Sequence, residues 1–258
     1  MRHDEYDRMS ELEENYWWHV GREHIIRKQL NKLNLDPASA KIINIGSGTG
    51  ATIPLLERYG TVTNVDTSPA AIAKAKEKGY QTIKIDRDSL PFDDSTFDLA
   101  VAFDVLEHIP DDFAALRDWQ RILKPSGHLM VTVPAHNWLW SAHDESLHHY
   151  RRYTVSQVHR LCNLAGFDVV KRSYAISFSF PMIVAYRFLS SLIPGRRHNH
   201  RTSYVRLPRP INAFFAFLLR IEGTLLKYIN APIGTSVLVV AVKEEHPSHV
   251  YPSHTEEP

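Results

Sequence analysis

The sequence has a single cysteine, almost no excess of charge and no apolar run near its start. One cysteine, Cys162, excludes an internal disulfide and favours a reducing compartment. It lies among apolar residues at helical spacing, so we expect a buried core residue rather than a reactive thiol. The formal net charge is +1, so no field of one sign points to a nucleic-acid partner. Residues 1–18 lack an apolar core, so we expect no secretory signal.

The sequence also lacks an uninterrupted apolar run long enough to cross a membrane. The longest apolar stretch, residues 174–194, contains Pro181 and Arg187. A central arginine costs roughly 2.5–3.5 kcal/mol in a bilayer. We therefore expect this stretch to fold against the protein or to lie at a membrane surface, and the protein to be cytoplasmic, with contact at the inner face of the membrane as an option.

Strand-like and helix-like segments alternate along most of the chain, which favours a parallel sheet with helices on both faces. The apolar runs that predict strands are 41–45, 62–65, 81–85, 98–103, 128–133, 167–174 and 235–242. The helical patterns cover 20–34, 51–58, 69–78, 112–123, 154–165 and 212–229.

The length of 258 residues fits one large α/β domain. We expect this single domain to cover residues 1–245, with 1–35 as an N-terminal helical lid and 175–232 as an apolar and basic helical insertion. Residues 246–258 are polar and rich in proline and histidine, which is typical of a disordered tail.

A glycine turn follows the first strand and precedes a helix. Gly46, Gly48 and Gly50 allow backbone angles that side chains forbid, and they let a ligand approach closely. We expect backbone amides at the start of the helix to face that ligand. The turn alone does not identify the ligand, because Gly46, Gly48 and Ala51 also fit the dinucleotide spacing G-x-G-x-x-G/A.

Two carboxylates follow the neighbouring strands. Asp66 ends the second strand, where a carboxylate meets ribose hydroxyls, although it would also serve as a turn cap. Asp86 ends the third strand and can accept a hydrogen bond from an adenine amino group. The stretch Leu90-Pro91-Phe92 that follows has no role in an NAD(P)-dependent oxidoreductase, which is the main rival interpretation.

These motifs occur in order as IINIGSGTG, VTNVDTSP, IDRDSLPFDDSTFDLAVAFDVLEHIPD and LKPSGHLMVTVP, and together they resemble the class I S-adenosylmethionine (SAM)-dependent methyltransferases. The resemblance covers roughly residues 41–133 and is strongest to the small-molecule branch. It implies a doubly wound, Rossmann-like seven-stranded sheet of order 3-2-1-4-5-7-6 whose last strand is antiparallel. It also implies SAM as the cofactor and an enzyme that moves a methyl group by in-line displacement. A non-catalytic SAM-binding protein is the second rival.

The resemblance assigns site residues one by one. The cofactor-binding set is Gly46, Ser47, Gly48, Gly50, Asp66, Thr67, Asp86, Arg87, Phe103 and Arg22, with Arg22 placed to pair with the SAM carboxylate. Asp104 follows the fourth strand near the sulfonium and joins the catalytic candidates, whereas His108 suits a structural role as well as a catalytic one. Asn44 departs from the family, which has an acidic residue at the end of the first strand.

Residues 134–153 follow the fifth strand and border the expected acceptor pocket. They offer three histidines, His143, His148 and His149, of which His143 is our first choice for a catalytic base and His148 the second. The segment also offers the acids Asp144 and Glu145 and the cations Arg151 and Arg152, which suit a structural role as well, as ion pairs that tie the loop to the following helix. The histidine and carboxylate spacings would also suit a metal site. Because SAM chemistry needs no metal and no cysteine accompanies these residues, we expect none.

The N-terminal residues Trp17 and Trp18 suit a lid, since aromatic faces stabilise a sulfonium by about 0.5–2 kcal/mol. Burial in an amphipathic helix explains them equally well. The insertion combines apolar helices with a basic turn at 195–201. It favours a small-molecule or lipid-like acceptor, with peripheral membrane contact through 175–232, although a cap on the sheet or a dimer interface would use the same residues.

Overall fold

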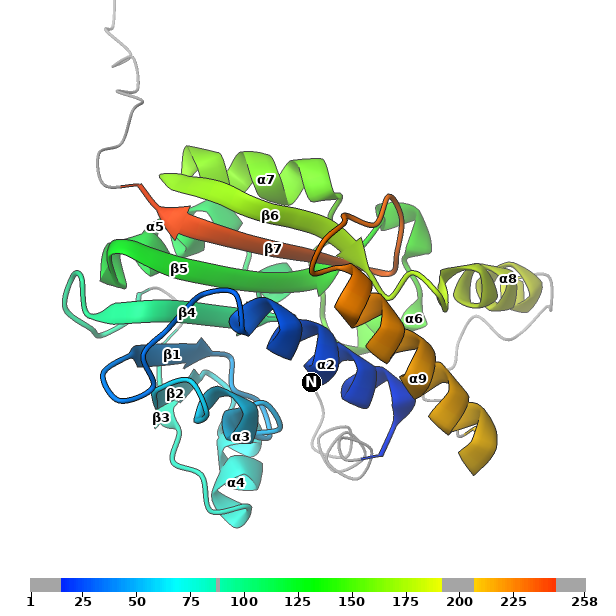
Figure 1. The fold of residues 1–258 in the computed structure, drawn as a ribbon, viewed down its shortest axis with the longest axis horizontal. Coiled ribbons are helices and arrows are strands. Elements are labelled where there is room, and N and C mark those ends of the chain that lie inside the picture. The colour runs from blue at the N-terminus through cyan, green and yellow to red at the C-terminus, as the bar shows by residue number, and fades with distance from the viewer. Residues whose placement is uncertain (1–14, 87–88, 192–206, 245–258) are drawn as a thin grey trace, which may run out of the picture.

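The computed structural model describes residues 15–86, 89–191 and 207–244 and shows one seven-stranded sheet flanked by helices (Figure 1). The strand order is β3-β2-β1-β4-β5-β7-β6, as the sequence predicts. The strands are β1 (Lys41–Ile45), β2 (Thr61–Asp66), β3 (Ile83–Lys84), β4 (Phe97–Phe103), β5 (Leu123–Pro134), β6 (Phe167–Ala175) and β7 (Ser236–Lys243).

Strands β1 to β5 are parallel, and β7 runs antiparallel to both β5 and β6. The carboxyl ends of β1, β2, β4 and β5 therefore meet at one edge of the sheet. At the far end of the sheet, β3 is shorter than the predicted 81–85, because it pairs only with β2 and leaves Ile83 exposed. Open α/β sheets bind ligands at the carboxyl ends of their parallel strands.

Helices cover both faces of the sheet. One face packs against α2 (Trp17–Leu30), α3 (Ile53–Leu56) and α9 (Arg209–Leu225). The other packs against α5 (Asp112–Ile122) and α7 (Val155–Leu164), where Cys162 is fully buried as predicted. The remaining elements are α4 (Pro69–Glu77), η1 (Leu106–His108), η2 (Asn137–Leu139), α6 (Ala142–Ser146) and α8 (Phe180–Ser191).

Two glycines let α2 and α9 pack closely, although the helices are far apart in the sequence and lie side by side in Figure 1. A Cβ atom added to Gly21 would meet the Leu219 side chain, and one added to Gly223 would lie 2.9 Å from a ring carbon of His24. The lid helix and the insertion helix therefore form one layer, which holds α2 against the sheet.

Parts of the predicted lid, insertion and tail lie outside the described residues. These parts are residues 1–14, the basic turn 195–201 and residues 246–258. Within the described residues, no helix combines the length and the apolar content needed to cross a membrane.

Candidate functional site

The glycine turn after β1 has a backbone that requires glycine. Gly46, Gly48 and Gly50 all have positive φ angles, of 68°, 56° and 87°. A Cβ atom at Gly46 would lie 2.5 Å from Cγ2 of Val105, which follows β4. The turn thus brings the ends of β1 and β4 into contact, and larger residues would push them apart.

The amides of Gly46, Ser47 and Gly48 already have partners within the protein. The amides of Gly46 and Ser47 donate to the carbonyl oxygen of Val65, at 2.9 and 3.0 Å. The Gly48 amide donates to Oδ2 of Asp66 at 2.8 Å. A pyrophosphate needs such amides free, and it would be repelled by the carboxylate beside them. The geometry therefore disfavours the dinucleotide interpretation.

Asp66 is held at the end of β2 with acceptor capacity to spare. Its side chain also accepts from the Ser68 amide at 2.8 Å, and the residue is 8% exposed. Burial raises the pKa of this carboxyl, against the opposing effect of the amides of Ser68 and Gly48. Each carboxylate oxygen can accept a second hydrogen bond. The residues present therefore fit a ligand with ribose hydroxyls.

Neutral side chains support the turn where the family has an acid. Asn44 is buried, and its Nδ2 donates to Oδ1 of Asn64 at 3.1 Å. Asn64 in turn donates to the Gln81 carbonyl at 3.2 Å, which links β1, β2 and the approach to β3. The side chains of Asn44 and Asn64 thus support the turn by hydrogen bonds, as an acidic residue would, but they carry no negative charge.

The predicted adenine side of the site is open. Thr67 and Asp86 are exposed, just beyond β2 and β3. Ser47 Oγ lies 3.4 Å from Oγ1 of Thr82, beside the same strand ends. Arg87 lies outside the described residues. The structure thus places Asp66 and Asp86 at neighbouring strand ends, as the sequence predicts.

Helix α2 supplies a cation at the other side of the turn. Arg22 Nη2 lies 2.6 Å from Oδ2 of Asp104 and donates to Oγ1 of Thr132 at 3.2 Å. Its guanidinium carbon also lies 5.1 Å from the Trp18 ring centre and 5.5 Å from that of Phe103. Three predicted site residues, Arg22, Phe103 and Asp104, are therefore brought together.

Of the two N-terminal tryptophans, one is buried in the core and the other lies near the candidate site. Trp17 is buried and packs against Phe215 of α9, with ring centres 5.4 Å apart. Trp18 is only half-buried and contacts Arg22. Trp17 is therefore a core residue, and Trp18 lies beside the residues of the candidate site.

An ion pair anchors the segment after β5. Asp144 is fully buried and accepts from Nε and Nη2 of Arg152, at 2.7 and 3.0 Å. Although burial pushes the other way, hydrogen bonds from His149 and Arg152 hold the pKa of Asp144 below its usual range. Arg151 adds a second tie, 2.8 Å from Oδ2 of Asp112. These contacts match the structural role foreseen for the charged residues.

The three histidines of this segment differ in position. His143 is half-buried on α6, whereas His148 is exposed and has a positive φ angle of 57°. His149 turns inward, and its Nδ1 lies 3.0 Å from Oδ1 of Asp144. The sequence ranked His143 and His148 ahead of the histidine that the fold buries most deeply.

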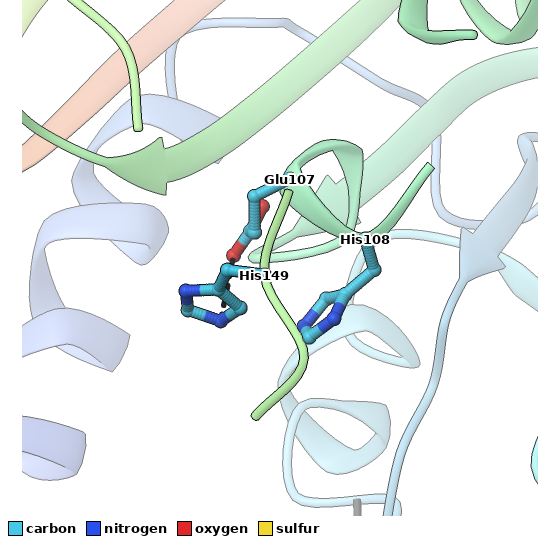
Figure 2. Close-up of side chains that lie close together, drawn as sticks. All are labelled: Glu107, His108 and His149. Atoms are coloured by element: carbon cyan, nitrogen blue, oxygen red, sulfur yellow. Dashed lines mark ion pairs between the residues drawn. The ribbon is translucent and has the colours of Figure 1, made fainter. Parts of the chain in front are cut away.

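Glu107 is the residue whose importance the sequence did not reveal. It lies in the short helix η1 after β4, its side chain is fully buried, and Oε1 is 4.0 Å from His149 Nε2 (Figure 2). No other residue among those described donates a hydrogen bond to either carboxylate oxygen. Burial, and then the charge of Asp104, raises the pKa of Glu107 well above its usual value. In the sequence, the only indication of its importance was its position directly before the candidate residue His108.

Comparison with known proteins finds methyltransferases. Residues 43–131 match a family model described as a methyltransferase domain. The ubiquinone biosynthesis O-methyltransferase of Xanthomonas oryzae is 29% identical over 147 residues, which cover 50% of this chain and 60% of that protein. The demethylmenaquinone methyltransferase of Tropheryma whipplei is 29% identical over 178 residues, covering 66% and 69% of the two chains.

Solved structures show the same fold. A methyltransferase complexed with the Trm112 methyltransferase activator of Haloferax volcanii gives a TM-score of 0.60 at 19% identity, covering 96% of this chain and 99% of that one. A SAM-dependent methyltransferase of Mesorhizobium loti gives 0.54 at 16% identity, covering 83% and 96%. Residues 43–131 are thus similar to a methyltransferase domain, and the fold is that of the class I SAM-dependent methyltransferases, whose cofactor is SAM.

Proposed function

We propose that this protein transfers the methyl group of SAM to a small, hydrophobic acceptor. The observation that carries the proposal is the Asp66 carboxylate, which is bound to the amide of Gly48 and keeps acceptor positions for hydroxyl groups. Such a carboxylate suits the ribose hydroxyls of an adenosyl ligand. Arg22 and Asp104 close the same edge of the sheet from the side of α2.

When bound, SAM supplies an electrophilic methyl group on a sulfonium. The protein's main task is then to align the acceptor with the S–CH3 bond, and alignment of this sort supplies about 7–11 kcal/mol of barrier reduction. Asp66 and the glycine turn would hold the adenosyl part, and Arg22 the carboxylate end. For an oxygen acceptor, His143 is the first candidate for the base and His148 the second.

The acceptor that the surroundings favour is a ring carrying an apolar tail. The relatives' names refer to ubiquinone, menaquinone and phytyl-hydroquinone compounds. In this chain, α9 buries one face against α2 and exposes apolar side chains at helical spacing on the other. These exposed side chains, the α9 stripe, are Ile211, Phe214, Phe217, Ile221 and Leu225.

The α9 stripe suits contact with an anionic membrane surface. Phe217 is 57% exposed, and the basic residues Arg209 and Arg220 are exposed on the same helix. Aromatic and aliphatic side chains enter the interfacial region, while each arginine near anionic lipid adds about 1 kcal/mol. A protein docked in this way would meet an acceptor whose tail lies in the bilayer.

A labelled-methyl assay tests the proposed function. The purified protein is incubated with methyl-labelled SAM and a cell extract, which is then split into lipid and aqueous fractions. We expect label in the lipid fraction, and calorimetric binding of SAM but not of NAD. Binding of SAM without transfer to either fraction would favour a non-catalytic protein, and binding of NAD alone would overturn the proposal.

A further inference from the structure

We propose that Glu107, His108 and His149 form a binding site for a divalent transition-metal cation. Each offers one ligand atom, and these atoms all lie within 4.8 Å of one another. Figure 2 shows the Glu107 carboxylate and the His149 ring directed toward each other, with the His108 ring beside them. The two histidine rings are in edge contact, with centres 4.6 Å apart.

The Glu107 side chain is the strongest argument for a ligand. It is 0% exposed, and no other described residue donates a hydrogen bond to Oε1 or Oε2. Burial of a carboxylate without a partner is costly, so buried carboxylates are paired, protonated or bound to a metal. Nε2 of His149 lies 4.0 Å from Oε1, which is too far for a hydrogen bond.

The orientation of His149 supports ligation through Nε2. Its Nδ1 lies 3.0 Å from the Asp144 carboxylate, which calls for a proton on Nδ1 and leaves the lone pair on Nε2. Arg152 binds both oxygens of Asp144 and fixes that carboxylate in place. A carboxylate behind an imidazole is the usual arrangement at metal-ligating histidines, where it sets both tautomer and ring angle.

The spacing and donor set indicate the kind of cation. Two ligand atoms around a tetrahedral Zn²⁺ lie roughly 3.4 Å apart. The 4.0 Å between Glu107 and His149 therefore needs only a small closure. Two imidazoles with one carboxylate favour Zn²⁺, Fe²⁺, Co²⁺ or Mn²⁺ over Ca²⁺ and Mg²⁺, which prefer oxygen ligands.

The cation would lie beside the proposed methyl-transfer site. A catalytic role for the cation therefore rests on the proposed function. Glu107 follows Val105, which contacts Gly46 of the turn, and Asp104, which pairs with Arg22. Three protein ligands leave coordination positions open, as in catalytic metal sites. An open position would hold an acceptor hydroxyl and lower its pKa, so that the oxygen attacks as an anion.

Metal titration tests the site without any activity measurement. The full-length protein is treated with a chelator, dialysed, and titrated calorimetrically with Zn²⁺, Co²⁺, Mn²⁺ and Mg²⁺. We expect one tight site for at least one of the first three ions and visible absorption bands from bound Co²⁺. Glu107→Gln should weaken that site at least 100-fold, whereas His159→Asn on α7 should leave it unchanged.

The variant also separates a metal ligand from a merely structural carboxyl. We expect Glu107→Gln to unfold at a temperature no lower than the metal-free wild type, and to lose the rise in unfolding temperature that the metal gives the wild type. Equal metal affinity in both proteins, or no stoichiometric binding by the wild type, would overturn the proposal. SAM binding is titrated separately: its failure contradicts the proposed function and leaves the metal result standing.

Discussion

Arg22 and Asp104 form an ion pair of 2.6 Å that joins the N-terminal helix to the end of β4. Asp104 keeps a positive φ angle of 58°, an unfavourable conformation for a residue other than glycine. Such a conformation persists where surrounding contacts over-determine it, and it is found often at functional sites. The pair therefore fixes α2 over the edge of the sheet where the cofactor is proposed to bind.

Arg22→Ala should weaken SAM binding by about 10- to 100-fold, since hydrogen bonds to charged groups contribute about 1.5–3 kcal/mol. Isothermal titration with SAM measures this loss. Glu23→Ala, an exposed neighbour on the same helix, should bind as the wild type does. Unchanged affinity in Arg22→Ala would remove this residue from the cofactor site.

Asp66→Asn should weaken SAM binding by at least tenfold. The single side-chain oxygen of asparagine cannot accept from both Gly48 and Ser68, and its amino group cannot accept from a ribose hydroxyl. The same titration on Asp93→Asn, an exposed carboxylate, provides the control and should show no loss. If both variants bound SAM normally, the carboxylate would have no part in the cofactor site.

His143→Ala should lower turnover more than SAM affinity, because a base acts on the acceptor rather than on the cofactor. General base catalysis contributes typically about 10²–10⁴-fold in rate. Turnover with the identified acceptor and SAM affinity are measured on the same preparation, and His148→Ala is compared. Equal losses of turnover and affinity in His143→Ala would contradict this role.

The Cys162 thiol should be unreactive in the folded protein. Burial raises its pKa to about 12, so the reactive thiolate is scarce at pH 8, and the residue is fully enclosed. A thiol reagent should label one cysteine per chain after denaturation and essentially none before it. Rapid labelling of the native protein would show that α7 separates from the sheet.

Replacing Phe214 and Phe217 together by serine should reduce binding to anionic vesicles. Both rings belong to the exposed α9 stripe, so their loss should cost membrane affinity more than stability. Co-sedimentation at low salt measures the effect, and Ala213→Ser, an exposed position on the same helix, is the control. A wild-type protein that ignores such vesicles would contradict membrane docking.

The sequence predicted the strand order, the position of the glycine turn and the carboxylates at the ends of β2 and β3. The strand order follows from the resemblance to the class I SAM-dependent methyltransferases. The turn and the acids depend on local patterns, since apolar runs, glycines and strand-end acids lie within a few residues of one another. The partners of the turn amides were not predicted. Their partners, Val65 and Asp66, belong to the neighbouring strand, and the turn residues alone do not reveal how the two strands meet.

The sequence by itself determined the class of fold and the residues of the cofactor turn, because both follow from backbone preferences and from the period of the apolar pattern. Only the tertiary structure decided that Glu107 meets His149, that Arg22 meets Asp104 and that α9 packs on α2. These contacts join segments distant in the chain. They depend on the packing of whole helices and strand ends, which no local pattern encodes.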